Sequence, residues 1–500
     1  MPTSPSTPKA VASPTALERR ERRLVGLPAP AVPGRGWFSS ALHRPTTWLL
    51  VVFFPLCVFL LWRIYLMFRV QTITSVAQAT EKAGQRMEPT VGQFNEAVVK
   101  CAQLAAISLA IGLFLYFLID RIHRTGFLLK VICVFWGGAV AVYFAVFVNS
   151  WVAALLGDSA NDESASTKAA IYVAPFVEEF AKATVLILLA ILVRRRLVSA
   201  IQVVTLAGLS AMSFAATENI TYYLKTYVSA AMVYGQDPTS ALRAMFLQRG
   251  LLTWWGHPLF TTCTAIGVAF AMRNRSKWVR VVAPLAGYLC AATLHMLFNG
   301  SSLFFGDDAG AAMTFLLIFG ASGVIGLLIR YFIHLRSEGR LVGQRLADFV
   351  REGWLDPRDP HVFSGFFRRV KLLLAALLRG PRTLIATVRI QRAMIELAYL
   401  RASVTWGTVD EAGQLRSREL LAIIRDARGT GLSETDGLHI KPTNWTLRNI
   451  RAALGRLIAR LRPRRSPGST PPLAPPPTGT PVMPPSPQAG QPVGAGRRWG

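Results

Sequence analysis

The chain contains eight apolar runs, each long enough to cross a lipid bilayer as a helix. They lie near residues 48–68, 102–120, 127–148, 169–193, 197–222, 251–272, 278–299 and 311–334. About 20 apolar residues span the hydrocarbon core, and lipid offers no partner for exposed backbone groups, so such a chain is restricted to membrane-spanning helices. The composition agrees, since 52% of the residues are hydrophobic and only 16% are charged. We therefore predict an all-α, polytopic membrane protein with about eight transmembrane helices.

The short loops between these runs predict the orientation of the helices. If the N-terminus is cytoplasmic, the inner loops contain RIHRTG, the three arginines at 194–196, and RNRSK. The outer loops include GDSANDESAS and GSSLFFGDDAG, which hold Asp and Glu but no Lys or Arg. This alternation follows the positive-inside rule. Both termini are therefore predicted to be cytoplasmic. The Ala- and Arg-rich composition is typical of a high-GC bacterial genome, so we predict the plasma membrane of a bacterium.

Three further regions flank the predicted membrane domain at 47–335. Residues 1–46 and 466–500 are rich in Pro and are predicted to be disordered, the first as a basic cytoplasmic tail. Residues 336–465 include FFRRVKLLLAALLRG and WTLRNIRAALGRLIARLRPRR, where basic and apolar residues recur at helical spacing. Such segments suit helices on an anionic inner leaflet, and a small soluble helical domain is an equal alternative. The net charge of +28 follows this topology and does not indicate nucleic-acid binding.

Four consecutive predicted spans carry polar side chains that hydrocarbon should exclude. These are Glu178, Glu179 and Lys182 in VEEFAK, Glu218 and Asn219 in FAATEN, His257 in WWGHPLF, and His295 and Asn299 in HMLFN. At 1.5 Å per residue, the two adjacent glutamates lie about 15 Å below the outer end of their helix and Lys182 lies one turn deeper, while the groups on the other three spans lie nearer the outer surface. Ionisable residues inside a membrane are costly and usually functional. Their shared depth predicts one site within residues 169–300.

Each polar group also has a structural explanation. Glu178 and Lys182 could form a buried ion pair, and Glu218 could be solvated at the interface. His257 could bond to a carbonyl freed by Pro258, and the remaining His and Asn pair could join two helices. We favour function because all of these groups fall on four consecutive helices in one half of the membrane.

Together these side chains could activate a water molecule and stabilise an oxyanion, as amide hydrolysis requires. Glu178 or Glu179 would activate the water, while the other carboxylate and Lys182 would tune it. His257, His295 and Glu179 would form the His₂Glu set of hydrolytic zinc sites. Without a metal, an imidazole N–H and the Asn299 amide would hold the oxyanion. The chain has no H-E-x-x-H, G-x-S-x-G or G-x-G-D motif.

The order of these motifs resembles the PrsW family of bacterial intramembrane proteases, which is related to the CAAX-prenyl endopeptidases and the bacteriocin-processing proteins. The similarity covers VEEFAK, FAATEN, a His in the next span and H-x-x-x-N in the one after, over about residues 130–335. It implies that the adjacent glutamates are essential, that Glu218, His257 and His295 complete the site, and that Asn299 contributes. It further implies cleavage of a membrane-anchored anti-sigma factor near the extracytoplasmic face. The family is described as metalloprotease, whereas its relatives are thought to use a metal-free glutamate mechanism, so the resemblance leaves a zinc cofactor open.

The sequence thus predicts an intramembrane endopeptidase whose partners are a membrane-anchored protein substrate and the lipid bilayer, with no nucleic acid. A proton-coupled transporter is the main alternative, because buried Glu, Lys and His also form proton relays. An inactive membrane scaffold is a third.

Overall fold

A computed structural model describes most of the chain between residues 45 and 434. The described ranges are 45–82, 84–120, 125–156, 163–193, 197, 199–274, 276–306, 308–405 and 411–434. The predicted Pro-rich tails, apart from residues 45 and 46, lie outside them. So do the basic segment WTLRNIRAALGRLIARLRPRR and the three arginines at 194–196.

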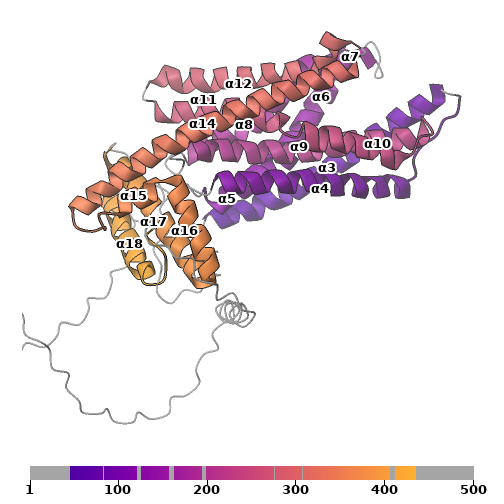
Figure 1. Ribbon diagram of the computed structural model, residues 1–500. Coiled ribbons are helices and arrows are strands. Elements are labelled where there is room, and N and C mark those ends of the chain that lie inside the picture. Colours follow the sequence, from indigo (N-terminus) through magenta and orange to yellow (C-terminus); the bar gives the residue numbers. More distant parts are fainter. Residues whose placement is uncertain are drawn as a thin grey trace, which may run out of the picture. The chain divides into compact units, whose positions relative to one another are not determined.

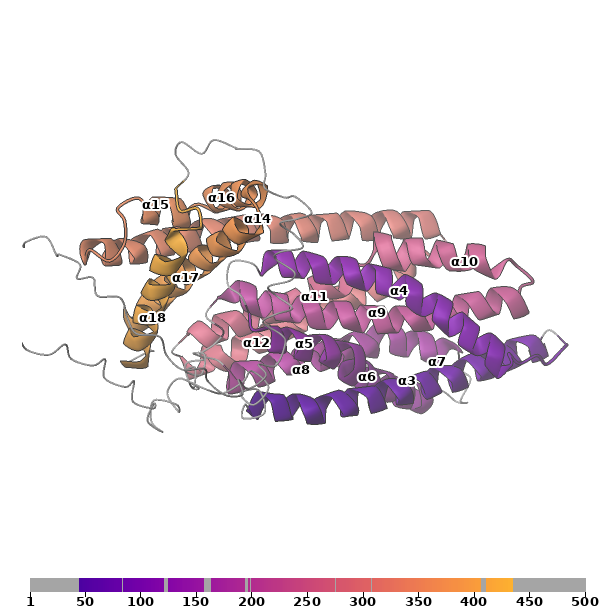
Figure 2. The same cartoon turned by 90° about the horizontal axis from the view of Figure 1, so that it is seen from below.

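The described residues form helices and no strand (Figures 1 and 2), which confirms the predicted all-α fold. The N-terminal half contains α3 (Pro45–Lys82), α4 (Val91–Ile119), α5 (Phe127–Phe135), η1 (Trp136–Ala141), α6 (Val142–Leu156), α7 (Glu163–Lys168), η2 (Ala169–Val173), α8 (Ala174–Leu192) and α9 (Ala200–Met232). The rest contains α10 (Pro238–Met245), η4 (Phe246–Leu252), α11 (Gly256–Arg273), α12 (Lys277–Asn299), α13 (Ser301–Phe305), α14 (Ala309–Arg351), α15 (Asp359–Ser364), α16 (Phe366–Arg379), α17 (Pro381–Thr405) and α18 (Glu411–Arg428). The segments labelled η are π-helical.

Six helical stretches of the described chain are long and apolar enough to cross a membrane. They are Leu50–Lys82, Val91–Ile119, Phe127–Leu156, Ala200–Met232, Lys277–Asn299 and Ala309–Arg351. The other two predicted spans correspond to α8 and α11, which are helical but do not meet this criterion. The 19 residues of α8 include Glu178, Glu179 and Lys182, and α11 opens with Gly-His-Pro. Six of the eight predicted spans therefore meet the criterion, and the count of eight remains a prediction.

Helix α9 forms the centre of the membrane domain. Within its apolar window 83% of the residues are buried, against 33% or less in the other five candidate spans. Small residues allow this close packing: a Cβ at Gly208 would lie 2.0 Å from the ring of Tyr116 on α4, and one at Gly137 would lie 1.9 Å from the carbonyl oxygen of Ser210. Small residues at contacts let helix backbones approach in a membrane. The rest of α9, including Glu218, is fixed by this packing.

Helices α11 and α12 pack as a close hairpin (Figure 1). A Cβ at Gly267 would lie 2.3 Å from the carbonyl oxygen of Ala283, and one at Gly287 would lie 2.5 Å from that of Cys263. Because both contacts are with backbone atoms, the two helices can be this close only with glycine at these positions. The hairpin brings the start of α11, with His257, beside the end of α12, with His295.

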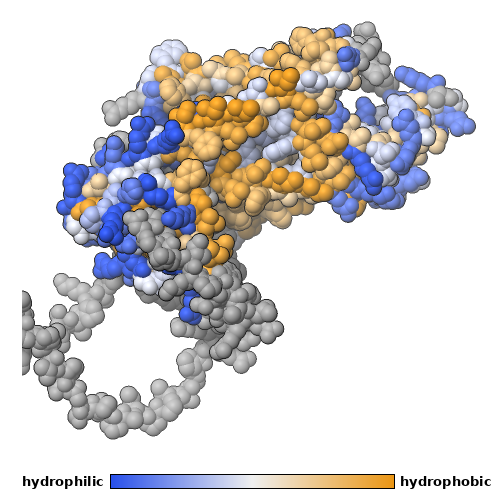
Figure 3. Space-filling view, in the orientation of Figure 1, coloured by the Kyte–Doolittle hydropathy of each residue, from blue (hydrophilic) through white to orange (hydrophobic). Residues whose placement is uncertain are grey.

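The end of α14 and helices α15–α18 form a second hydrophobic core. Its buried residues include Val342, Leu346, Phe363, Leu372 and Met394, and Ile201 at the start of α9 belongs to the same cluster. The described part of the predicted region 336–465 is therefore helical and packed. Figure 3 shows a broad apolar band over the long helices, with hydrophilic residues gathered beyond its two ends.

Candidate functional site

The two adjacent glutamates lie in the first turns of α8, where the helix follows a π-helical turn. Pro175 occupies the start of α8, a position that suits its fixed backbone angle and missing N–H. Glu178 is 6% exposed, and Glu179 and Lys182 are fully buried. Polar groups buried to this degree need partners, and the neighbouring helices supply them.

Glu179 has partners for both of its carboxylate oxygens. Its Oε1 accepts a hydrogen bond from Lys182 Nζ at 2.7 Å and lies 3.1 Å from His295 Nδ1. Its Oε2 accepts a hydrogen bond from Thr261 Oγ1 at 2.7 Å. Glu179 thus connects α8 with α11 and α12.

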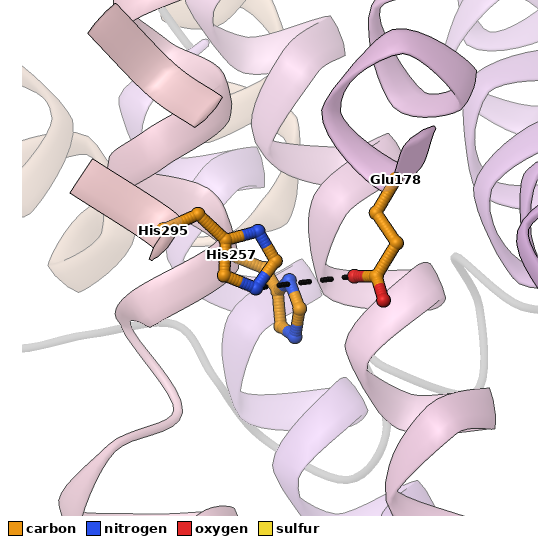
Figure 4. Close-up of side chains that lie close together, drawn as sticks. All are labelled: Glu178, His257 and His295. Carbon is orange, nitrogen blue, oxygen red and sulfur yellow. Dashed lines mark ion pairs between the residues drawn. The ribbon is translucent and has the colours of Figure 1, made fainter. Parts of the chain in front are cut away.

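Glu178 has no such set of partners. Its Oε2 lies 3.6 Å from Lys182 Nζ and 3.9 Å from His295 Nε2, and it has no hydrogen-bond partner among the described residues. Figure 4 shows this carboxylate beside the imidazoles of His257 and His295, with a dashed line marking the pair it forms with His295. A buried oxygen without a partner calls for an explanation, such as a bound ion or water.

The two imidazoles lie against each other, and each has a carboxylate of its own. Their ring centroids are 5.0 Å apart and the planes are almost perpendicular, at 88°. His257 Nε2 lies 2.9 Å from Glu218 Oε2, while its Nδ1 lies 2.7 Å from Lys182 Nζ. His295 pairs with Glu179 as described and stacks on the ring of Phe260. Carboxylates placed in this way fix the tautomer and orientation of imidazoles.

Glu178, His257 and His295 each offer a ligand atom, and these atoms all lie within 4.8 Å of one another. The sequence hypothesis grouped the two histidines with Glu179 instead. Successive residues of a helix point about 100° apart, so only the packing of the neighbouring helices decides which glutamate faces the imidazoles.

Arg249 is a part of the site that sequence reasoning missed. It lies in η4, where its Nε donates to Asn219 Oδ1 at 3.0 Å and an Nη donates to Glu218 Oε2 at 3.2 Å. Its guanidinium also lies 3.6 Å from the centre of the Tyr222 ring. The available signal was an arginine directly before an apolar run, on the side where the positive-inside rule expects few basic residues.

Thr261 was missed as well, although it follows His257 by four residues on the same face of α11. Asn299 lies at the edge of the site rather than among the charged groups: its Nδ2 donates to the carbonyl oxygen of Ala170 in η2, at 2.9 Å. The structure therefore connects six of the seven predicted residues in one network and places the seventh at its border. The connected six are Glu178, Glu179, Lys182, Glu218, His257 and His295.

A small cavity borders this network. Its volume is about 20 Å³, and it is lined by Glu218, Arg249, His257, His295 and Asn299 together with apolar residues that include Phe260 and Phe298. This space holds about one water molecule. Both imidazoles therefore face a site where a single water could be bound.

Residues 126–327 match the family model described as PrsW family intramembrane metalloprotease. This stretch is a PrsW-family domain. It contains every residue of the site described above, and its extent agrees with the similarity expected over residues 130–335. The match supports an intramembrane-peptidase domain over residues 126–327. None of the curated proteins and none of the solved structures matched the chain.

Proposed function

We propose that the chain is an intramembrane endopeptidase that hydrolyses a peptide bond in a membrane-anchored protein, near the extracytoplasmic face. Regulated cleavage of an anti-sigma factor is the family role that this would match. The observation that carries the proposal is the buried Glu178 Oε2, which has no hydrogen-bond partner in the described part of the chain and faces two imidazoles. It lies within a domain of a peptidase family.

Glu178 is the better candidate to take a proton from the attacking water. A general base needs an oxygen within hydrogen-bond reach of the water, and Glu178 Oε2 is uncommitted. Glu179 uses both oxygens to hold Lys182, Thr261 and His295. We therefore assign Glu179 to positioning and Glu178 to proton transfer.

Lys182 allows the two carboxylates to lie side by side in a buried position. Its ammonium is 2.7 Å from Glu179 Oε1 and 3.6 Å from Glu178 Oε2, so it offsets the repulsion between the two negative charges. It also donates to His257 Nδ1, which leaves the proton of that ring on Nε2, facing Glu218. His257 is in this way held in one tautomer by groups on two other helices.

The residues fit a divalent metal. Glu178, His257 and His295 form a His₂Glu donor set of the type that binds catalytic zinc, so with a metal bound Oε2 of Glu178 would be a metal ligand instead of the general base. His295 has its Nδ1 on Glu179, which leaves Nε2 for a metal. His257 would have to exchange its contact with Lys182 or with Glu218. A bound zinc ion would polarise the scissile carbonyl and acidify a water.

The closed site has no room for a peptide. Its cavity of about 20 Å³ is far smaller than ordinary ligand pockets of about 300–1,000 Å³. A substrate strand must therefore displace side chains of the lining, among them Trp254 and Phe298. We expect the water to remain beside the imidazoles while the strand enters.

The test compares purified wild-type protein with Glu178→Gln, and uses Glu96→Gln as a matched control. Glu96 lies on α4 and forms an exposed ion pair with Lys100 outside the site. Each protein is incubated with a library of single-span membrane substrates, and its zinc content is measured. Wild type and Glu96→Gln should cleave the same substrate, and Glu178→Gln should not.

Two results would count against this function. Full cleavage by Glu178→Gln would remove the proposed base. A wild-type protein that cuts nothing but carries a proton-driven flux in vesicles, lost in Glu178→Gln, would favour a transporter.

A further inference from the structure

Helix α16 packs on the C-terminal core with only one of its faces. Arg369, Leu372, Ala375 and Ala376 are buried, and Gln391 on α17 donates to the carbonyl oxygen of Arg369 at 2.9 Å. This face fixes the rotation of the helix about its axis. The direction of the remaining side chains is therefore determined.

The other face of α16 is apolar and exposed. Phe367 is 78% exposed and Leu374 57%, with Leu377 and Leu378 beside them and Ile385 following on α17. Residues 367, 374 and 378 share one side of the helix, because they are separated by seven and four positions. We call these five residues the α16 face. An exposed apolar patch of this kind marks an interaction surface, and α16, with 14 residues, is too short to span a bilayer.

Basic residues surround the α16 face, and acidic ones are absent from its sequence neighbourhood. Residues 360–395 contain no Asp or Glu. The same stretch contains Arg368, Arg369, Lys371, Arg379, Arg382, Arg389 and Arg392. Lys371 and Arg382 are exposed; in the sequence, Lys371 lies between Phe367 and Leu374, and Arg382 lies three residues before Ile385. An amphipathic helix with this composition suits an anionic lipid surface.

The C-terminal core is attached at the ends of the transmembrane helices. Helix α14 runs without a break from an apolar, membrane-crossing stretch into this core. Ser199, the N-cap of α9, donates to Glu338 on α14 at 2.8 Å, and Ile201 belongs to the same cluster as Leu372 of α16. In Figure 1, α16 runs across the direction of α4 and α9, and Figure 2 agrees. This is the orientation of a helix that lies along a membrane surface.

We propose that the α16 face binds the anionic phospholipids of the leaflet next to it. Its apolar side chains would enter the boundary between headgroups and acyl chains, while Lys371 and Arg382 contact the phosphates. Charge argues against two other occupants. A second copy of the chain would bring two basic surfaces together, and the segment WTLRNIRAALGRLIARLRPRR of the same chain is itself basic.

The experiment places a fluorophore on the full-length protein. Cys263 and Cys290 are replaced by Ser, because the other three cysteines are buried, and Phe367→Cys is labelled with an environment-sensitive dye. Arg418→Cys on α18 is the matched exposed control. Each protein is reconstituted in vesicles of phosphatidylcholine, with or without phosphatidylglycerol, and quenching by brominated lipid is measured.

The dye at 367 should be quenched in vesicles that contain phosphatidylglycerol, and the dye at 418 should not. Lys371→Glu with Arg382→Glu should remove most of this quenching, whereas Arg418→Glu with Arg425→Glu on α18 should leave it unchanged. Absence of quenching at 367 would overturn the proposal, as would equal quenching in neutral vesicles. An apolar dye environment without lipid quenching, lost when the chain is ended after Glu434, would overturn it too, because the occupant would then be the chain's own C-terminal segment.

Discussion

Glu178 and Glu179 stand side by side on α8 and have different partners. Three groups on three helices hold the oxygens of Glu179, whereas no residue that the structure describes forms a hydrogen bond with Oε2 of Glu178. This difference supports the proposal that Glu178 takes part in the chemistry and that Glu179 positions its neighbours. A similar arrangement surrounds His257 on α11: Glu218 on α9 lies against its Nε2, opposite the contact of Lys182 with Nδ1, and Arg249 donates to Glu218.

This difference predicts a large loss of stability for a change at Glu179 and almost none for a change at Glu178. Glu179→Ala would leave Lys182 buried without its nearest counter-charge, and breaking a buried ion pair costs about 3–5 kcal/mol. Glu178→Gln keeps the shape of the side chain and removes no hydrogen bond of Oε2, so stability should change by less than about 1 kcal/mol. Both variants should lose cleavage. Thermal unfolding in detergent distinguishes them, and equal unfolding temperatures would contradict the assignment.

Arg249 is expected to act through Glu218 rather than on the substrate. Its planar guanidinium reaches Glu218 and Asn219 with two nitrogens, and a lysine at this position cannot make both contacts. Loss of a group that orients a histidine ligand typically lowers activity about 10–100-fold, so Arg249→Lys should reduce kcat in this range with little change in KM. Arg243→Lys, at an exposed position on α10, is the control. Unchanged kcat in Arg249→Lys would assign the arginine a purely structural role.

Most of the residues that gather at the candidate site could be named from the sequence, but the contacts between them could not. Glu178, Glu218, His257 and His295 stand out because charge and imidazole are rare in apolar helices. The rotation of α8 relative to α11 and α12 decides which glutamate faces the histidines. No local pattern in the sequence predicts this rotation. Arg249 was missed because the apolar run was taken to begin two residues after it.

At the scale of elements, the site depends on where helices depart from regular α geometry. Segments η2 and η4 are π-helical; the first precedes α8 and the second carries Arg249. Such bulges are frequent at functional sites. The sequence predicted the helices around them, because hydrophobic runs are long-range signals. It did not predict the π turns, because a π turn is a local change in the register of backbone hydrogen bonds that no particular residue type signals.

The hairpin of α11 and α12 supplies a test at this scale. Gly267→Ala would place a methyl group 2.3 Å from the carbonyl oxygen of Ala283, so the two helices must separate and His257 must move relative to His295. Overpacking of this kind costs about 1–3 kcal/mol, and we expect cleavage to fall with it. Gly326→Ala on α14 is the matched control, since a Cβ there would meet nothing within 4 Å among the described residues beyond the backbone of its own helix. If both variants behave like wild type, close packing of the hairpin does not position the histidines.

At the scale of the whole molecule, the polar residues of α8 and α11 make it less favourable for these two helices to cross a membrane. Neither helix is among the six candidate spans: α8 carries three charged residues of the site, and α11 opens with Gly-His-Pro. Their polar groups are paired with one another inside the bundle, so little charge faces lipid. A helix enclosed in this way can cross a membrane although its polar composition alone would make the crossing unfavourable.

The predicted topology can therefore be tested at the positions that flank these two helices. With the accessible cysteines removed, Lys168→Cys, Gln236→Cys, Ser276→Cys and Asp308→Cys are labelled in intact cells with an impermeant maleimide. If α8 and α11 both span, Lys168→Cys, Gln236→Cys and Asp308→Cys should react from outside, and Ser276→Cys only after permeabilisation. Labelling of Lys168→Cys and Gln236→Cys from opposite sides would show that α8 does not cross. Labelling of Gln236→Cys and Ser276→Cys from the same side would show this for α11, and the site would then lie at the surface rather than within the bilayer.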